Sequence, residues 1–309
     1  MILNGKTPRL SDDTEGLDVL GPAIAGAPDV PGDGIAQDGI AQDMDAGGIR
    51  ISQSLIKNLG REDACPRRIM EVYVNNLKTD PNEAQLKGML FEYHITASAG
   101  ISGQVPIEPV GTGNKRYVDF VRVEEQAFFV RDVLLPHYGF ELYASDVELS
   151  TEFASPHLPV PITVRGRLDA IGLREGKPCI IDFKATATID SPHAMYAWKS
   201  PSTMDHTQAY LYMWLYARNR EVNWNGYIPD FYYIVAEWGP KKDYEIIRVK
   251  WNALKVMEVE QAIIAGHSLM RQHHADGWPE IPSFYECRGC PVRHACAKRK
   301  TFKEIKTVD

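Results

Sequence analysis

The 309-residue sequence has few cysteines and no long hydrophobic segment. Its longest apolar runs, such as YLYMWLYA at 210–217, are much shorter than the ~20 residues that cross a bilayer. No cleavable signal pattern opens the chain. Five cysteines are also a poor disulfide framework for a chain of this length. We therefore expect a soluble, cytoplasmic protein without a membrane partner, whose clustered cysteines act as ligands.

The sequence also lacks a basic excess, since its formal net charge is −7. Residues 1–49 hold nine acidic and two basic side chains, and the remaining chain has 32 of each sign. Residues 1–48 are rich in Gly, Pro, Asp and Ala, and they include the tandem DGIAQDGIAQD. Such a segment cannot bury enough apolar surface to offset its ordering entropy. We expect a disordered acidic tail over 1–48 and one domain over 49–309, which leaves a nucleic-acid partner possible.

Hydrophobic periodicity predicts helices and strands in a mixed order. The helical spacing falls at 50–76, 82–100, 123–139, 204–219 and 252–274. Extended segments are expected at 140–150, 162–174, 177–186, 230–238 and 244–251. This order of elements predicts a mixed α/β (α+β) domain with a small central mixed sheet flanked by helices. Helices come first, and then strands, one helix, a strand pair and a final helix.

The segment GRLDAIGLREGKPCIIDFKAT places acids on two predicted strands joined by a short turn. Asp182 and Lys184 are two apart on one strand and project to the same face, with Asp169 on the preceding strand. Carboxylates in so apolar a run are costly unless a cation compensates them. Two carboxylates and a backbone carbonyl suit Mg²⁺ or Mn²⁺, and a nearby lysine suits phosphodiester hydrolysis. A salt bridge across a sheet is the alternative interpretation.

Together these motifs resemble the PD-(D/E)XK nuclease superfamily, and in particular the RecB-like exonucleases. The resemblance covers roughly residues 50–300 and implies a restriction-endonuclease-like core. It implies these site residues: Glu92 of a G-x-x-x-E pattern that starts at Gly88, Asp169, Asp182, Lys184, and the Gln208 and Tyr212 of Q-x-x-x-Y. Glu92, Asp169, Asp182 and the Phe183 carbonyl would hold the metal. Many relatives have His where Glu92 stands, so His94 is held in reserve, although the two positions point about 200° apart on a helix.

Three of the five cysteines occur together in CRGCPVRHAC, as Cys287, Cys290 and Cys296. Within the resembled family, the AddB nuclease domain and CRISPR-associated exonucleases carry a [4Fe–4S] cluster on three such cysteines and one upstream cysteine. The resemblance implies that Cys65 is the fourth ligand and that the cluster joins the two ends of the domain. Four thiolates also suit Zn²⁺, and His294 could complete a local zinc site. Cys179 is expected to be an apolar core residue.

Two groups of residues are candidates for DNA contact. Arg67, Arg68, Lys298, Arg299 and Lys300 lie near the cysteines in sequence and could form a phosphate-binding rim, or remain solvated charges. Tyr196, Trp198 and Lys199 could stack and guide a single strand, or simply pack.

The combined expectation is a Mg²⁺- or Mn²⁺-dependent exonuclease that acts on DNA with a free or single-stranded end. The resemblance implies a prokaryotic or phage setting in recombination, repair or genome processing, with a recombination or replication protein as a possible partner. The alternatives are a structure-specific endonuclease on the same fold and a non-catalytic iron–sulfur DNA-binding module.

Overall fold

The computed structural model describes residues 50–61, 63–78, 81–97, 114–190, 198–219, 221–223, 226–281, 287, 290–292 and 296. For residues 114–118 it describes the backbone only. The predicted acidic tail lies outside these residues. So do four candidate positions, namely Tyr196, Lys298, Arg299 and Lys300, and the alternative zinc ligand His294.

The helices lie at the predicted positions with two exceptions: α5 begins at Asn114, nine residues before the expected start, and Arg50–Ile51 form a strand where a helix was expected. The α-helices are α2 (Gln53–Leu59), α3 (Pro66–Ile69), α4 (Glu83–Thr96), α5 (Asn114–Phe129), α6 (Leu135–His137), α7 (Thr207–Arg218) and α8 (Ala253–Ala275). Two of them continue as short π-helices, η1 (Met70–Val74) after α3 and η3 (Val130–Leu134) after α5. The segment η4 (Pro201–Thr203) is a single 3-10 turn.

Six strands form one mixed sheet: β1 (Arg50–Ile51), β2 (Phe140–Phe153), β3 (Ile162–Arg174), β4 (Lys177–Thr186), β5 (Asp230–Glu237) and β6 (Tyr244–Val249). β3 pairs antiparallel with β2 along its whole length. Its other edge pairs with β1 in parallel at residues 163–164 and with β4 antiparallel at residues 170–174. β5 lies parallel to β4 and pairs antiparallel with β6.

The turn between β3 and β4 is a two-residue hairpin, as the sequence predicts. Glu175 and Gly176 have φ values of 51° and 77°, and Arg174 faces Lys177 across the ladder. Two successive residues with positive φ match the right-handed twist of the flanking strands. This tight connection sets the register that brings Asp169 and Asp182 to the same end of the strand pair.

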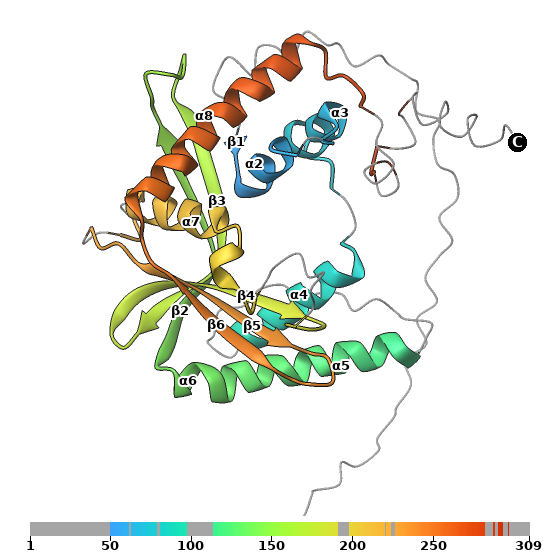
Figure 1. Cartoon of the computed structure of the whole chain (residues 1–309), viewed down its shortest axis with the longest axis vertical. Coiled ribbons are helices and arrows are strands. Elements are labelled where there is room, and N and C mark those ends of the chain that lie inside the picture. The colour runs from blue at the N-terminus through green and yellow to red at the C-terminus, as the bar shows by residue number, and fades with distance from the viewer. Residues whose placement is uncertain are drawn as a thin grey trace, which may run out of the picture. The chain divides into compact units, whose positions relative to one another are not determined.

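Helices cover both faces of the sheet (Figure 1). On one face α4, α5 and η3 pack against Ala170, Ile181 and Phe183. On the other face α2, α7 and α8 pack against Leu168, Ile180 and neighbouring strand residues. None of the helices within the described residues is long and apolar enough to cross a bilayer. The observed architecture confirms the expected mixed α/β fold with a mixed sheet between helices.

Local chemistry fixes the start of α4, the helix that carries Glu92. The Asn82 side chain accepts a hydrogen bond from the Gln85 amide at 3.0 Å, and the Gln85 side chain accepts one from the Asn82 amide at 2.8 Å. This reciprocal capping box satisfies two amides that the helix leaves without an intrahelical partner. On the inner side of the helix, Phe91 and Ile95 are fully buried. The cap and this apolar anchor set the height of Glu92 above the sheet.

Candidate active site

Asp182 and Lys184 lie on the same face of β4, as the strand period predicts. The side chain of Asp182 is 1% exposed, and its Oδ2 forms an ion pair with the Lys184 ammonium. The neighbouring residues Ile181 and Phe183 point into the opposite apolar core. The lysine therefore supplies the positive charge that a deeply buried carboxylate requires.

Asp169 meets Asp182 at the point where β3 and β4 separate. The ladder between these strands ends at the pair of Ala170 and Ile181. Two residues beyond Ile181, the Phe183 amide donates a hydrogen bond of 2.8 Å to Oδ2 of Asp169, which lies just beyond the ladder on β3. A side chain thus takes over the bond that a strand carbonyl would otherwise accept, which anchors the Asp169 carboxylate beside β4.

Glu92 belongs to this site and His94 does not. Among neighbouring charges, that of Asp169 has the largest effect on the pKa of Glu92, and Lys184 also contributes. His94 points toward α5 instead, where its Nε2 lies 3.5 Å from Glu124 Oε1 and its ring packs edge-on against Phe128. The helical phase separates the two residues as the sequence predicts, and the placement favours Glu92 as the helix-borne ligand.

Gln208 and Tyr212 on α7 lie over the same carboxylates. Gln208 Nε2 donates a hydrogen bond of 2.9 Å to Asp182 Oδ1, so both oxygens of Asp182 are engaged. Burial raises the pKa of Tyr212 to about 12, although a hydrogen bond with Gln208 acts in the lowering direction. The phenol therefore stays protonated at neutral pH, and it can orient Gln208 but cannot serve as a base.

Burial raises the pKa of all three acids, and the Asp169 charge adds to this rise at Glu92 and Asp182. Burial and then the Asp169 charge raise the pKa of Glu92 to about 8. Burial, opposed by Lys184 and aided by Asp169, raises the pKa of Asp182 to about 7. Burial also raises the pKa of Asp169, against the opposing effects of Lys184 and the Phe183 amide. The three carboxyl groups are difficult to ionise at the same time. A bound cation would favour their ionised forms by compensating the negative charge.

Two charged residues that sequence reasoning did not select, Arg167 and Asp146, also act on this cluster of acids. Arg167, two positions before Asp169, forms an ion pair with Asp146 of β2. The Arg167 charge lowers the pKa of both Glu92 and Asp169, while Asp146 raises them. Asp146 has a φ of 55°, a conformation that aspartate tolerates better than most residues. The i, i+2 spacing of Arg167 and Asp169 was the one available signal for this arrangement.

The oxygen atoms of this site are chemically suited to a hard divalent cation. Carboxylates of Glu92, Asp169 and Asp182, with the Phe183 backbone beside them, are oxygen donors of the kind that Mg²⁺ and Mn²⁺ prefer. In the part of the chain that is described, however, no three His, Cys, Asp or Glu side chains converge closely enough to form a metal group. The ammonium of Lys184 already neutralises Asp182 in this arrangement.

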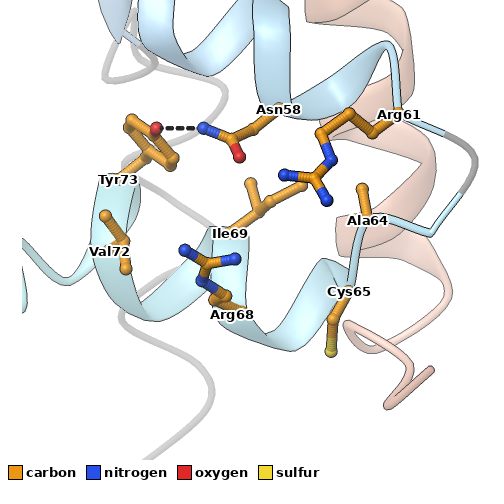
Figure 2. A pocket seen from close by; sticks show the side chains of 8 residues that line it. All are labelled: Asn58, Arg61, Ala64, Cys65, Arg68, Ile69, Val72 and Tyr73. Atoms are coloured by element: carbon orange, nitrogen blue, oxygen red, sulfur yellow. Dashed lines mark hydrogen bonds between the residues drawn. The ribbon is translucent and has the colours of Figure 1, made fainter. Parts of the chain in front are cut away.

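Three of the four predicted cluster cysteines interact electrostatically, but among the described residues no three cysteines converge as a metal-binding group. Cys65 lies at the N-terminal end of α3, with Arg61 and Arg68 around the same small cavity (Figure 2). Burial raises the pKa of Cys290, and the charges of Cys65 and Cys287 contribute in the same direction. Cys65 is therefore within electrostatic reach of a cysteine more than 200 positions later. Cys179 is a buried core residue, 1% exposed, as expected.

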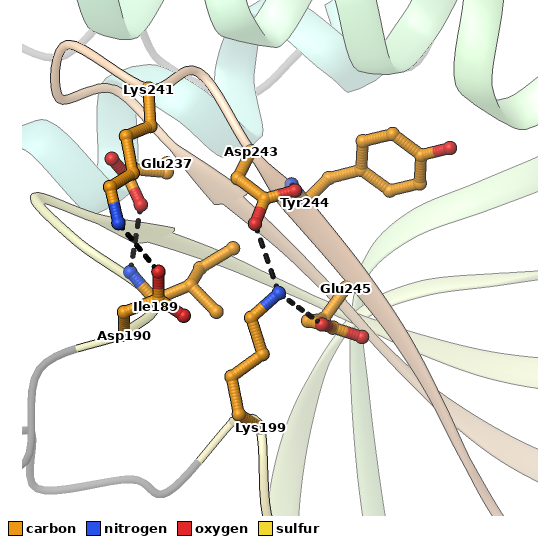
Figure 3. A network of polar contacts seen from close by, with 8 residues as sticks. All are labelled: Ile189, Asp190, Lys199, Glu237, Lys241, Asp243, Tyr244 and Glu245. Atoms are coloured by element: carbon orange, nitrogen blue, oxygen red, sulfur yellow. Dashed lines mark hydrogen bonds and ion pairs between the residues drawn. The ribbon is translucent and has the colours of Figure 1, made fainter.

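The candidate DNA-contact residues differ in their surroundings. Trp198 is 3% exposed and packs against Tyr233 at a ring distance of 5.9 Å, which favours a packing role over stacking on a base. Lys199 pairs with Asp243 at 2.9 Å and Glu245 at 2.8 Å in a network beside the β5–β6 turn (Figure 3). Arg67 pairs with Glu71 at 2.8 Å within one helical segment.

A protein-family comparison decides the wider relationship. The family model described as the PD-(D/E)XK nuclease superfamily matches residues 111–297. This chain belongs to the PD-(D/E)XK nuclease superfamily. The match spans the strands that carry Asp169, Asp182 and Lys184, whereas Glu92 lies before the matched residues. A nuclease of this superfamily generally uses a divalent metal such as Mg²⁺.

One solved structure supports the fold. A "putative exonuclease" from Eubacterium rectale superposes with a TM-score of 0.53 at 17% identity, covering 88% of this chain and 95% of its own. At that identity the likeness concerns the fold alone. The crystal structure of SSO0001 aligns over 86% of this chain and 98% of its own, with a TM-score of 0.37 and 13% identity. No curated protein sequence matches this PD-(D/E)XK chain.

Proposed function

We propose that this PD-(D/E)XK nuclease is a Mg²⁺- or Mn²⁺-dependent DNA exonuclease. The observation that carries the proposal is the grouping of Asp169 and Lys184 around the buried Asp182 carboxylate where β3 and β4 separate, with Glu92 beside it. The alternative interpretation, a salt bridge between Asp182 and Lys184, does not account for three neighbouring acids whose pKa values are all raised. Exonuclease action is also the activity named for the structural neighbour from Eubacterium rectale.

The metal would be held by the carboxylates of Glu92, Asp169 and Asp182 and by the Phe183 carbonyl. When bound, a divalent cation polarises the phosphate and lowers the pKa of a coordinated water. Glu92 and Asp182 must lose their protons for this binding, because only ionised carboxylates are effective ligands. Their raised pKa values thus couple metal affinity to pH.

The remaining residues of the site orient the carboxylates and stabilise negative charge on the phosphate. The Lys184 ammonium, 27% exposed, is near enough to the acids to stabilise negative charge that develops on a phosphate. Gln208 holds Oδ1 of Asp182 and fixes the orientation of that carboxylate. Tyr212 shields this contact with its buried ring. The chain's own contribution is therefore a preorganised acidic site with the partly exposed Lys184 ammonium beside it.

We further propose that Cys65, Cys287, Cys290 and Cys296 bind a [4Fe–4S] cluster with a structural role. The support is the electrostatic proximity of Cys65, Cys287 and Cys290, which come from opposite ends of the domain. Thiolates are the ligands of such clusters, and zinc is the alternative occupant. Arg67 and Arg68 would then lie beside the cluster as phosphate contacts.

The proposed setting is the cytoplasm of a prokaryote or of a phage-infected cell. There the enzyme would process DNA from single-stranded or free ends in recombination or repair, with a recombination or replication protein as a partner. This setting comes from the family relationship.

The proposal is tested with linear and circular DNA of the same sequence in Mn²⁺, using wild type, Lys184→Ala and Asp182→Ala. Degradation of linear DNA alone, lost in both variants, is the expected result. Cutting of closed circles by the wild type would show an endonuclease instead. Equal, negligible turnover by all three proteins would show a non-catalytic module.

A further inference from the structure

One edge of β3 has an uncovered interval next to the carboxylate site. β1 pairs with residues 163–164 of this edge, and β4 joins it only from residue 170. Within the described part of the chain, no strand pairs with residues 165–169 on that side. The interval begins just after Val164, which faces Ile51 of β1, and ends at Asp169. The sheet thus leaves an opening that leads along β3 to the acids.

A groove of about 780 Å³ lies over this opening. β1, α2, η1, β2, β3 and α7 all line it, and the residues that matter to its chemistry are Arg50, Tyr73, Glu148, Arg165, Arg167 and Tyr212. Tyr212 connects the groove to the site because it hydrogen-bonds with Gln208, which binds Asp182. At the opposite end, Tyr73 is shared with the small cavity beside Cys65.

The groove carries an excess of positive charge. Its lining has three arginines and one acid, Glu148. Arg167 is paired with Asp146, but Arg50 and Arg165 are exposed, and their side chains have neither a hydrogen bond nor an ion pair with any described residue. Two unpaired guanidinium groups beside an acidic site are a binding feature for a partner that supplies its own negative charges.

The arginines are arranged in a row and do not converge on one point. Arg165 and Arg167 are two residues apart on β3, so about 6.6 Å separates their positions along the strand. Arg50 continues the row from the neighbouring strand, where it faces Thr163. A single small anion would need converging donors, whereas a row of cations matches the repeated phosphates of a polynucleotide.

Gly166 allows the groove and α7 to lie close together. A Cβ at this position would come within 2.7 Å of Leu215 Cδ1 and 3.0 Å of Tyr212 Cε1. The absent side chain lets the Tyr212 ring lie directly on β3, on the face that Gly166 shares with the buried Val164 and Leu168. The half-buried Tyr73 of η1 is an aromatic ring in the groove lining, and an aromatic ring in a basic groove is a feature of sites that hold unpaired nucleotides.

We propose that this groove binds the sugar–phosphate backbone of single-stranded DNA, through Arg50 and Arg165, and directs the strand to the carboxylate site. The direction of the strand rests on the nuclease function proposed above, but the binding itself does not require cleavage. Recognition through phosphates makes the binding independent of base sequence.

The test uses fluorescence anisotropy of labelled oligo-dT in EDTA, with the full-length protein and the double variant Arg50→Gln/Arg165→Gln. Loss of two phosphate contacts should weaken binding about 10-fold. It should also reduce the slope of log K against log salt by about 1.4, at about 0.7 per contact on a single strand. Lys177→Gln is the matched control, because Lys177 is exposed at the distant hairpin turn and also lacks a partner among the described residues. The control should bind as the wild type does.

Several outcomes would overturn the groove proposal. These are an unchanged affinity and salt slope in the double variant, an equal loss in Lys177→Gln, no binding by the wild type, or tighter binding of a duplex than of the single strand. A thermal unfolding midpoint equal to that of the wild type shows that the double variant is folded. Groove-dependent binding by a wild type that cleaves nothing in Mn²⁺ would instead refute the nuclease function and leave the groove standing.

Discussion

The metal-free protein should become less stable as pH rises through the neutral range, and Asp182→Asn should remove much of this loss. The folded pKa is about 8 for Glu92 and about 7 for Asp182, against ordinary values of 4.5 and 3.8. Between the ordinary and the folded values, the folded state binds more protons than the unfolded state. The free energy of unfolding therefore falls with rising pH over this window, and the site opposes folding once its acids ionise.

The magnitude follows from the size of the shifts. A difference of three pKa units corresponds to about 4 kcal/mol for an isolated group, and the coupling through Asp169 makes the separate contributions less than additive. We expect Asp182→Asn to be more stable than the wild type by about 2 kcal/mol at pH ~8.5, or roughly 5 °C in the unfolding midpoint. At pH ~5 this advantage should be absent, because Asp182 is then protonated in the folded wild type.

The assay is differential scanning calorimetry in EDTA across pH, with Asp230→Asn as a control. Asp230 is a carboxylate on β5 that pairs with Arg248 at the surface, away from the acids. The control should keep the wild-type pH slope. Added Mn²⁺ should raise the wild-type midpoint at high pH far more than that of Asp182→Asn, since binding to the folded state stabilises it. Parallel pH profiles for wild type and Asp182→Asn would refute the reasoning.

Three other substitutions probe separate features. Gly166→Ala places a methyl group against Leu215 and should destabilise the fold by about 1–3 kcal/mol in chemical denaturation; an unchanged midpoint would show that α7 does not pack as described. Gly88→Ala meets nothing within 4 Å and should raise stability by about 0.5–1 kcal/mol, so a loss of stability in the same assay would contradict the open space over α4. Cys65→Ser should abolish the iron content and visible absorbance of anaerobically purified protein, whereas Cys179→Ser should keep both; equal iron in the two variants would exclude Cys65 as a ligand.

Much of the fold was predictable because its signals are local. The boundaries of β3 and β4 match the expected segments, since a two-residue turn and apolar strands define them within a short stretch of chain. The pairing of Asp182 with Lys184 followed from strand period alone. The separation of Glu92 from His94 followed in the same way from the helical phase.

The features that sequence did not reveal depend on distant contacts. β1 is only two residues long and exists through its pairing with β3, more than 100 positions away. The left-handed backbone of Asp146 and its ion pair with Arg167 arise from the register of β2 against β3. Trp198 looks like an exposed aromatic in a polar segment, yet the core around Tyr233 covers it.

The central claim is that Glu92, Asp169 and Asp182 together bind the catalytic cation. Its most direct test is a crystal of the protein soaked in Mn²⁺, with anomalous diffraction recorded at the manganese edge. The account predicts one strong anomalous peak bounded by these three carboxylates and the Phe183 carbonyl, and no such peak in Asp182→Asn. A wild-type crystal with no peak there, or with manganese only at other positions, would contradict the account.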